Sequence, residues 1–131
     1  MGQTIRHTLL ILVFSMVLAN IAMAGELENS LLSEAMFGSN PAKIRELVEK
    51  GANVNARDYA GRTALIMISS VRSKTSNEIV RYLIEKGANV NAYDKNGYTA
   101  LIQAAQYGNT AIVETLLNNG ADVNARNNDG V

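Results

Sequence analysis

Apolar residues recur at three- and four-residue intervals in short segments, and glycine-containing turns separate these segments. The clearest segment follows Thr99, where apolar residues at positions 100, 101, 104 and 105 predict a short helix. A second helix is expected after Thr110, because apolar residues recur at 112, 113, 116 and 117. Thr99 can cap the first helix, and Gly120 can end the second in the left-handed conformation. Two helices this short cannot bury their apolar faces alone, so they require neighbouring helices.

A short Gly-Ala box marks the end of such a helix pair at three places along the chain. The copies are Gly51-Ala52-Asn53-Val54-Asn55-Ala56, Gly87-Ala88-Asn89-Val90-Asn91-Ala92 and Gly120-Ala121-Asp122-Val123-Asn124-Ala125. The first glycines of the boxes are 36 and then 33 residues apart, and the turn glycines Gly61, Gly97 and Gly130 keep the same two steps. A fixed period of this size indicates a stack of repeated units.

The residues around each turn glycine resemble those of the ankyrin repeat. Two stretches match the first-helix motif of the family, Asp58-x-x-Gly61-x-Thr63-Ala64-Leu65 and Asp94-x-x-Gly97-x-Thr99-Ala100-Leu101, and the Gly-Ala boxes match the end of its repeat. Ala64 and Ala100 replace the proline of the family, and Ile66 and Ile102 replace its histidine. The resemblance implies an all-α repeat solenoid, in which stacked helix–loop–helix units are joined by β-hairpin-like loops.

We expect the ankyrin-repeat domain to occupy residues 25–131. Residues 25–56 form an N-terminal capping repeat with polar outer positions, and its second helix begins at Asn40-Pro41. Residues 57–92 and 93–125 form two full repeats, and residues 126–131 begin a further, truncated repeat. The repeat at 57–92 carries three extra residues within 69–76, which predict a longer loop between its helices. The sequence shows no polar capping helix after these residues. We expect either a fragment of a longer array or a short protein whose stack has an open end.

Residues 1–24 have the organisation of a secretory signal peptide. Arg6 and the amino terminus give a positive start, an apolar run extends from Leu9 to Ala19, and Ala22-Met23-Ala24 suits signal peptidase. A run of about eleven residues is shorter than the roughly 20 that cross a bilayer as a helix. We therefore expect cleavage before Gly25 and a periplasmic or secreted, bacterial-type protein with no membrane attachment. The alternative is an uncleaved anchor or a buried helix.

Composition excludes several classes of function. After cleavage, 11 basic and 12 acidic residues remain, which offers no electrostatic footprint for nucleic acid. The chain has no cysteine, and its single histidine, His7, lies in the signal segment, so the commonest soft-metal ligands, general base and thiol nucleophile are missing. A calcium loop around Gly97 fails, because Ala92 and Gln103 stand where carboxylates are required. We expect no enzyme activity, no catalytic residue, no metal and no cofactor.

The resemblance to ankyrin repeats also implies a groove lined by the turn tips and by the exposed side of each first helix. The corresponding positions are Tyr59, Ala60, Arg62, Ser70 and Val71 in one repeat and Lys95, Asn96, Tyr98, Gln106 and Tyr107 in the next. Tyr59, Arg62 and Tyr98 lead this set, because tyrosine and arginine are enriched in binding hot spots. The competing interpretation of the tyrosines is that they are ordinary surface residues.

The expected function is therefore the binding of an unidentified protein partner through this groove. Two alternatives stay open at this point. The chain is the non-catalytic portion of a longer exported enzyme, or it is a structural array that self-associates through its open C-terminal face.

Overall fold

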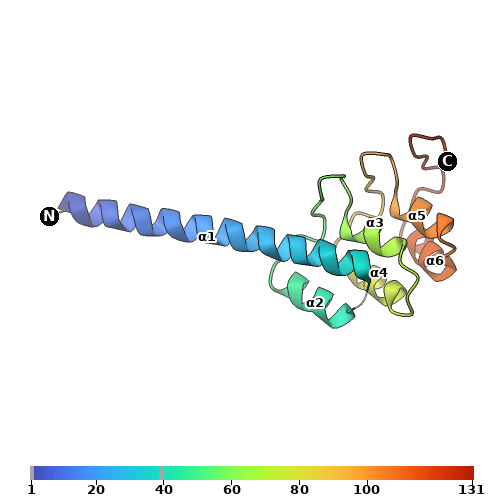
Figure 1. The fold of residues 1–131 in the computed structure, drawn as a ribbon, viewed down its shortest axis with the longest axis horizontal. Coiled ribbons are helices and arrows are strands. Elements are labelled where there is room, and N and C mark those ends of the chain that lie inside the picture. The colour runs from blue at the N-terminus through green and yellow to red at the C-terminus, as the bar shows by residue number, and fades with distance from the viewer. Residues whose placement is uncertain (1, 39) are drawn as a thin grey trace.

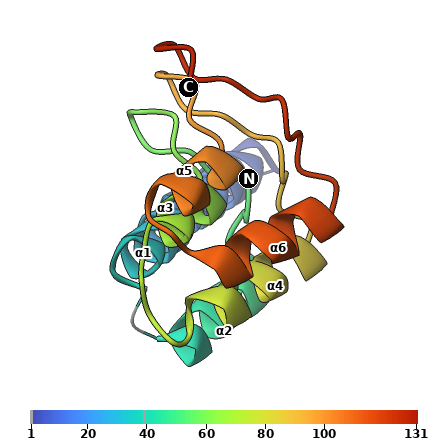
Figure 2. The ribbon, with the colours of Figure 1, turned by 90° about the vertical axis from the view of Figure 1, so that its right-hand side faces the viewer.

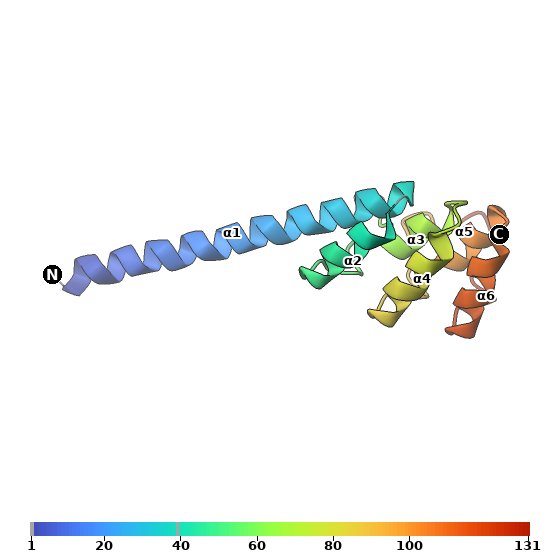
Figure 3. The ribbon, with the colours of Figure 1, turned by 90° about the horizontal axis from the view of Figure 1, so that it is seen from below.

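Three helix pairs stack in chain order along one axis (Figure 1). The computed structural model describes residues 2–38 and 40–131. The helices are α1 (Gly2–Phe37), α2 (Pro41–Glu49), α3 (Ala64–Ser69), α4 (Ser76–Glu85), α5 (Ala100–Gln106) and α6 (Thr110–Asn118). The end of α1 packs on α3, and α3 packs on α5, while α2, α4 and α6 form a second layer (Figure 3). The fold is thus an all-helical stack of helix pairs, as the repeat pattern predicted.

Polar residues at the helix starts act as the expected caps. The Thr63 hydroxyl accepts a hydrogen bond from a backbone N–H of α3 at 3.3 Å, and the Thr99 hydroxyl does the same for α5 at 3.2 Å. At α2, the Asn40 side chain accepts from the Lys43 N–H at 3.2 Å, and Pro41 occupies the first helical position. The predictions for Thr99 and for the helix start at Asn40-Pro41 are confirmed, and Thr63 plays the same role at α3.

The start of α6 differs from this pattern. Asn109 is the N-cap residue, but its side chain makes no hydrogen bond to α6. Its Nδ2 instead donates to the carbonyl of Ser69 at 2.7 Å and to that of Val71 at 3.3 Å. The side chain therefore ties the α5–α6 turn to the loop at residues 70–75, which is the longer loop that the extra residues predicted.

α1 is much longer than the other helices, and only its C-terminal part packs on the stack (Figure 1). Every side chain from residue 3 to residue 24 is exposed, whereas Leu31 and Ala35 are fully buried. The helix continues through the boundary expected at Gly25. The segment Gln3–Phe37 is long and apolar enough to cross a membrane, because apolar residues extend well beyond the run from Leu9 to Ala19. Length and composition therefore suit a signal sequence and a membrane anchor alike.

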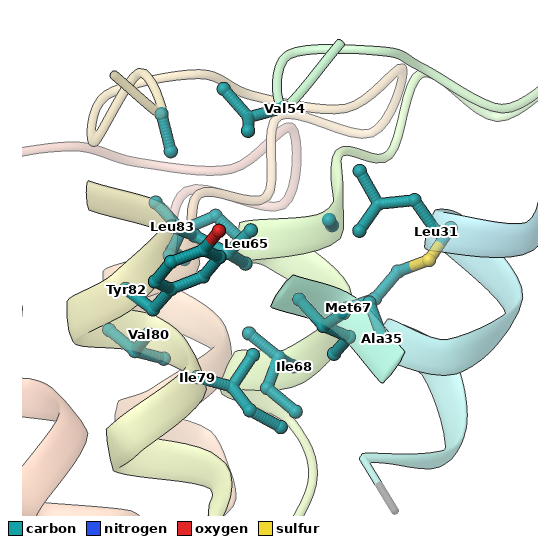
Figure 4. Close-up of a cluster of buried hydrophobic side chains, with 14 of the residues drawn as sticks. Leu31, Ala35, Val54, Leu65, Met67, Ile68, Ile79, Val80, Tyr82 and Leu83 are labelled. Atoms are coloured by element: carbon teal, nitrogen blue, oxygen red, sulfur yellow. The ribbon is translucent and has the colours of Figure 1, made fainter. Parts of the chain in front are cut away.

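The hydrophobic core runs continuously through the stacked pairs. Figure 4 shows Leu31 and Ala35 of α1 beside Met67 and Ile68 of α3, with the side chains of α4 on the other side. All six residues of α3 are buried, since α1, α4 and α5 all pack against this helix. The expectation of an exposed side on the first helix is therefore wrong for α3. Tyr82 is buried, and the Arg45 guanidinium lies 4.8 Å from the centre of its ring.

Candidate functional site

Three loops project side by side from one edge of the stack (Figures 1 and 2). They follow α2, α4 and α6, and one side chain organises the tip of each loop by accepting two backbone hydrogen bonds. These acceptors are Asp58 for the N–H groups of Ala60 and Arg62, Asp94 for those of Asn96 and Tyr98, and Asn127 for those of Asp129 and Val131, all at 2.9–3.0 Å. The tips thus share one backbone conformation, and a glycine with positive φ follows in each: Gly61, Gly97 and Gly130.

Asn127 accepts the same two backbone hydrogen bonds as the aspartates, but unlike them it leaves a buried polar group without a partner in the described part of the chain. Its Nδ2 is buried and has no hydrogen-bond partner among the described residues. A buried donor without a partner loses its hydrogen bonds to water and gains none in return. A carboxylate has no N–H to leave unpaired, which explains why aspartate suits this turn.

Backbone hydrogen bonds join the tips of neighbouring loops. The Lys95 N–H donates to the Ala60 carbonyl at 3.0 Å, and the Asn128 N–H donates to the Asn96 carbonyl at 2.9 Å. The approach is so close that a Cβ on Gly97 would lie 3.0 Å from the backbone nitrogen of Asn128. Glycine is required here by packing as well as by its φ of +80°.

A second set of hydrogen bonds joins the loops near the helices. The Asn55 side chain donates to the Gly87 carbonyl at 3.0 Å and accepts from the Asn89 N–H at 2.7 Å. The Asn91 side chain repeats this pattern, with the Gly120 carbonyl at 3.0 Å and the Asp122 N–H at 2.8 Å. Each loop is therefore held to the next at its tip and at its base, so the tip side chains form an ordered row.

The candidate residues at the tips lie together, but they differ in how available they are. The Tyr59 side chain is 86% exposed. Lys95 and Asn96 are exposed on the next tip, and Ala60 and Tyr98 are half-buried. Tyr59 is therefore the most accessible of the leading candidates.

Arg62 is less free than the sequence suggested. Its Nε and Nη2 bind Asp58 Oδ2 at 2.8 and 2.7 Å. Burial alone would raise the pKa of the Asp58 carboxyl, but the hydrogen bonds and charge of Arg62 hold that pKa below its ordinary value. Arg62 thus stabilises its own loop, and only part of its side chain can reach a partner.

The candidates at the helix ends lie apart from the tips. Ser70 and Val71 follow α3, whose six residues separate them from the tips by about 9 Å of helix. Val71 packs against the core, and the Ser70 hydroxyl donates to the Met67 carbonyl at 2.8 Å. Gln106 and Tyr107 end α5 and are exposed. The ten candidates therefore form two groups rather than one continuous site.

A further row of large side chains was missed by the sequence analysis. Arg57, Tyr93 and Arg126 precede the turn residues Asp58, Asp94 and Asn127, so they occupy one position in successive loops. Tyr93 is 64% exposed, and Arg57 Nη1 donates to the Tyr93 carbonyl at 2.7 Å. Tyr93 and Arg126 line a hollow of about 380 Å³ between the last two loops. The repeat steps of 36 and 33 residues would have identified this row, had they been applied to the position before each turn residue.

In the part of the chain that the structure describes, no three histidine, cysteine, aspartate or glutamate side chains gather where they could hold a metal ion. Two of the carboxylates at the tips, those of Asp58 and Asp94, serve the turns. The arrangement presents side chains on a rigid frame, which is what a binding surface requires.

Comparison with known proteins agrees with this geometry. The family model described as ankyrin repeats (3 copies) matches residues 13–94 and 30–127. These two ranges include all six helices in whole or in part, and the first two loops. A search of curated proteins found no match.

Proposed function

The chain belongs to the ankyrin-repeat family, whose members generally mediate protein–protein interaction, and we propose that it is an exported, bacterial-type binding protein that holds a partner protein on its loop tips. The observation that carries this proposal is the row of exposed tip side chains on doubly braced loops. A surface that is ordered before binding loses little conformational entropy when the partner arrives.

Tyr59 and Tyr98 are the central contacts of the proposed surface, with Lys95 and Asn96 beside them. The Tyr59 ring is almost fully accessible, so a partner can bury most of its area. Tyr98 is half-buried, and Asp94 fixes its backbone with two hydrogen bonds. The Tyr98 N–H donates to the Asp94 carboxylate, and the Tyr98 carbonyl accepts from the Asp94 N–H. Arg62 supports the tip through Asp58 and offers its remaining exposed edge to the partner.

Tyr93 extends this surface toward the base of the loops. It is exposed, and its neighbour Arg126 brings a positive charge to the same hollow. Asp122 lines the hollow as well, so the charge there is balanced. We therefore expect contacts with polar and aromatic groups of a protein rather than with a polyanion.

Export is supported by how little residues 3–24 contribute to the fold. None of these side chains is buried, and Leu27 is the first residue of α1 that packs against the core. Cleavage before Gly25 would therefore remove no packed side chain. The protein recovered from the periplasm or the medium should begin at Gly25, as measured by intact mass. A mass that retains Met1 would refute the cleavage.

A pair of tyrosine variants tests the surface. Tyr59→Ala should weaken capture of the partner from the exported fraction by about thirtyfold, the effect of losing a hot spot of roughly 2 kcal/mol. Tyr107→Ala is the matched control, because Tyr107 is also an exposed tyrosine but lies at the end of α5. Both variants should keep the helical circular dichroism of the unaltered protein.

The two variants give distinct outcomes. Loss of capture with Tyr107→Ala alone would move the contacts to the helix-end group. Unchanged capture by both variants would refute the tip surface.

A further inference from the structure

The sequence contains two Asn-Gly pairs, and the structure places them in different surroundings. Asn96-Gly97 lies at the tip of the middle of the three loops (Figure 1), and Asn119-Gly120 follows α6. Asparagine is a chemically labile residue, because its side-chain amide carbon can be attacked by the backbone nitrogen of the next residue. A glycine in that next position has no side chain to hinder the attack. Asn96 and Asn119 are therefore the asparagines whose sequence most favours this reaction.

A hydrogen bond holds the side chain of Asn119. Its Nδ2 donates to the Thr115 carbonyl of α6 at 2.7 Å. The backbone nitrogen of Gly120 is also engaged, since its N–H donates to the Leu117 carbonyl at 3.2 Å. Both hydrogen bonds must break before the Asn119 amide carbon and the Gly120 nitrogen can react.

The side chain of Asn96 has no such tether. It is exposed, and it makes no hydrogen bond to any residue that the structure describes. The Gly97 N–H donates to the Asp94 carbonyl at 3.0 Å, so one hydrogen bond must break here instead of two. Neighbouring tips lie on both sides of this one, at Ala60 and at Asn128, and they leave the Asn96 side chain open to water.

We propose that Asn96 is a site of spontaneous deamidation in the folded protein, with water as the only co-reactant. The Gly97 nitrogen loses its proton to water and forms a bond to the Asn96 Cγ. The bond from Cγ to Nδ2 breaks, so that ammonia leaves and a five-membered succinimide ring remains. Water then opens this ring. Opening at Cγ gives aspartate, and opening at the backbone carbonyl carbon gives isoaspartate, with no oxidation or reduction in either case.

Both products change the loop tip. A carboxylate replaces a neutral amide directly beside Lys95, so it offsets the positive charge of that side chain. Isoaspartate also lengthens the backbone by one carbon atom. The tip has little room for this change, because the Asn96 carbonyl accepts from the Asn128 N–H at 2.9 Å, and a Cβ on Gly97 would lie 3.0 Å from the same nitrogen. The isoaspartate form should therefore lose the backbone hydrogen bond between these two tips.

The proposal goes beyond the binding function of the loop tips and does not depend on it. The reaction needs no partner protein, since every reacting atom except water belongs to the Asn96-Gly97 pair. Asn96 is nevertheless one of the residues of the proposed binding surface, so its conversion would change that surface with the age of the molecule.

Peptide mapping separates the two asparagines. Cleavage after Glu85 and Glu114 places Asn96 in residues 86–114 and Asn119 in residues 115–131, and tandem mass spectrometry then identifies the modified position. The full chain, kept in solution by a mild detergent, is incubated at neutral pH and sampled over time. Asn96 should be modified about two to ten times faster than Asn119, which is the factor expected from one additional hydrogen bond.

Unfolding in urea provides the control, because it breaks the hydrogen bonds at both sites. The two asparagines should then be modified at similar rates. An equal preference for Asn96 in urea would show that the neighbouring residues in the sequence, and not the structure, select the site, and this result would overturn the proposal.

Two further results would contradict the proposal, whatever the outcome for export or partner capture. One is modification of Asn119 in the folded chain at a rate equal to or above that of Asn96. The other is an unmodified Asn96 in the folded chain under conditions in which the unfolded chain reacts. In the Asn96→Gln variant the longer side chain would have to close a six-membered ring, so position 96 should stay unmodified.

Discussion

Replacing Asn91 with alanine is expected to weaken the junction between the last two helix pairs. Its side chain makes two hydrogen bonds across this junction, to the Gly120 carbonyl at 3.0 Å and from the Asp122 N–H at 2.8 Å. Each such bond contributes about 0.5–1.5 kcal/mol net, so their loss should lower the free energy of unfolding by about 1–3 kcal/mol. Because Asn91 is exposed, water can replace some of the lost hydrogen bonds. We therefore expect the decrease in unfolding free energy to lie in the lower half of this range.

Asn124 provides a matched control within the same chain. It occupies the same position in the third Gly-Ala box, but its side chain makes no hydrogen bond to another loop among the described residues. Urea unfolding followed by circular dichroism should show Asn124→Ala within about 0.5 kcal/mol of the unaltered protein. For Asn91→Ala, Tm should fall by roughly 4–8 °C per kcal/mol lost. Equal destabilisation by the two variants would refute the role given to the cross-loop bonds.

Two further predictions follow from the loop tips. Gly97→Ala and Gly130→Ala each introduce a side chain at positive φ, which costs about 1–2 kcal/mol, but only at Gly97 would the new Cβ meet another loop, at 2.9 Å from Asn128 Oδ1. Gly97→Ala should therefore lower the urea midpoint more than Gly130→Ala, and equal midpoints would contradict the close approach of the loops. Because the pKa of Asp58 is held below its ordinary value, its carboxylate stabilises the fold above about pH 4, and this contribution is lost as pH falls through the lowered pKa. Asp58→Asn keeps the turn acceptor, as Asn127 does, and should reduce the slope of stability against pH below pH 4; an unchanged slope would show that the ion pair with Arg62 is not the cause.

The candidate site was only partly predictable from the sequence. Tip positions such as Tyr59 and Lys95 could be assigned because the spacing of the turn glycines sets the register of each loop. The sequence did not predict the ion pair of Arg62 with Asp58. An arginine side chain long enough to contact a partner protein is also long enough to bind a carboxylate in its own loop, and the sequence does not distinguish the two. Tyr93 was overlooked for a simpler reason, because it precedes the turn motif that carried the resemblance.

The sequence by itself determined the helices and turns of each repeat, because these depend on interactions between residues close together in the chain. A capping threonine, a glycine that tolerates positive φ and an apolar face of helical period each act within a few residues, so the sequence displays them directly. Burial and exposure were decided by the stack, because they depend on which helix lies beside which. For this reason α3 is buried on every side, while Leu117 and Val123, equally apolar in sequence, remain exposed on the last pair. Only the tertiary structure shows how each pair packs on the one before it, and this packing decides which apolar side chains become buried.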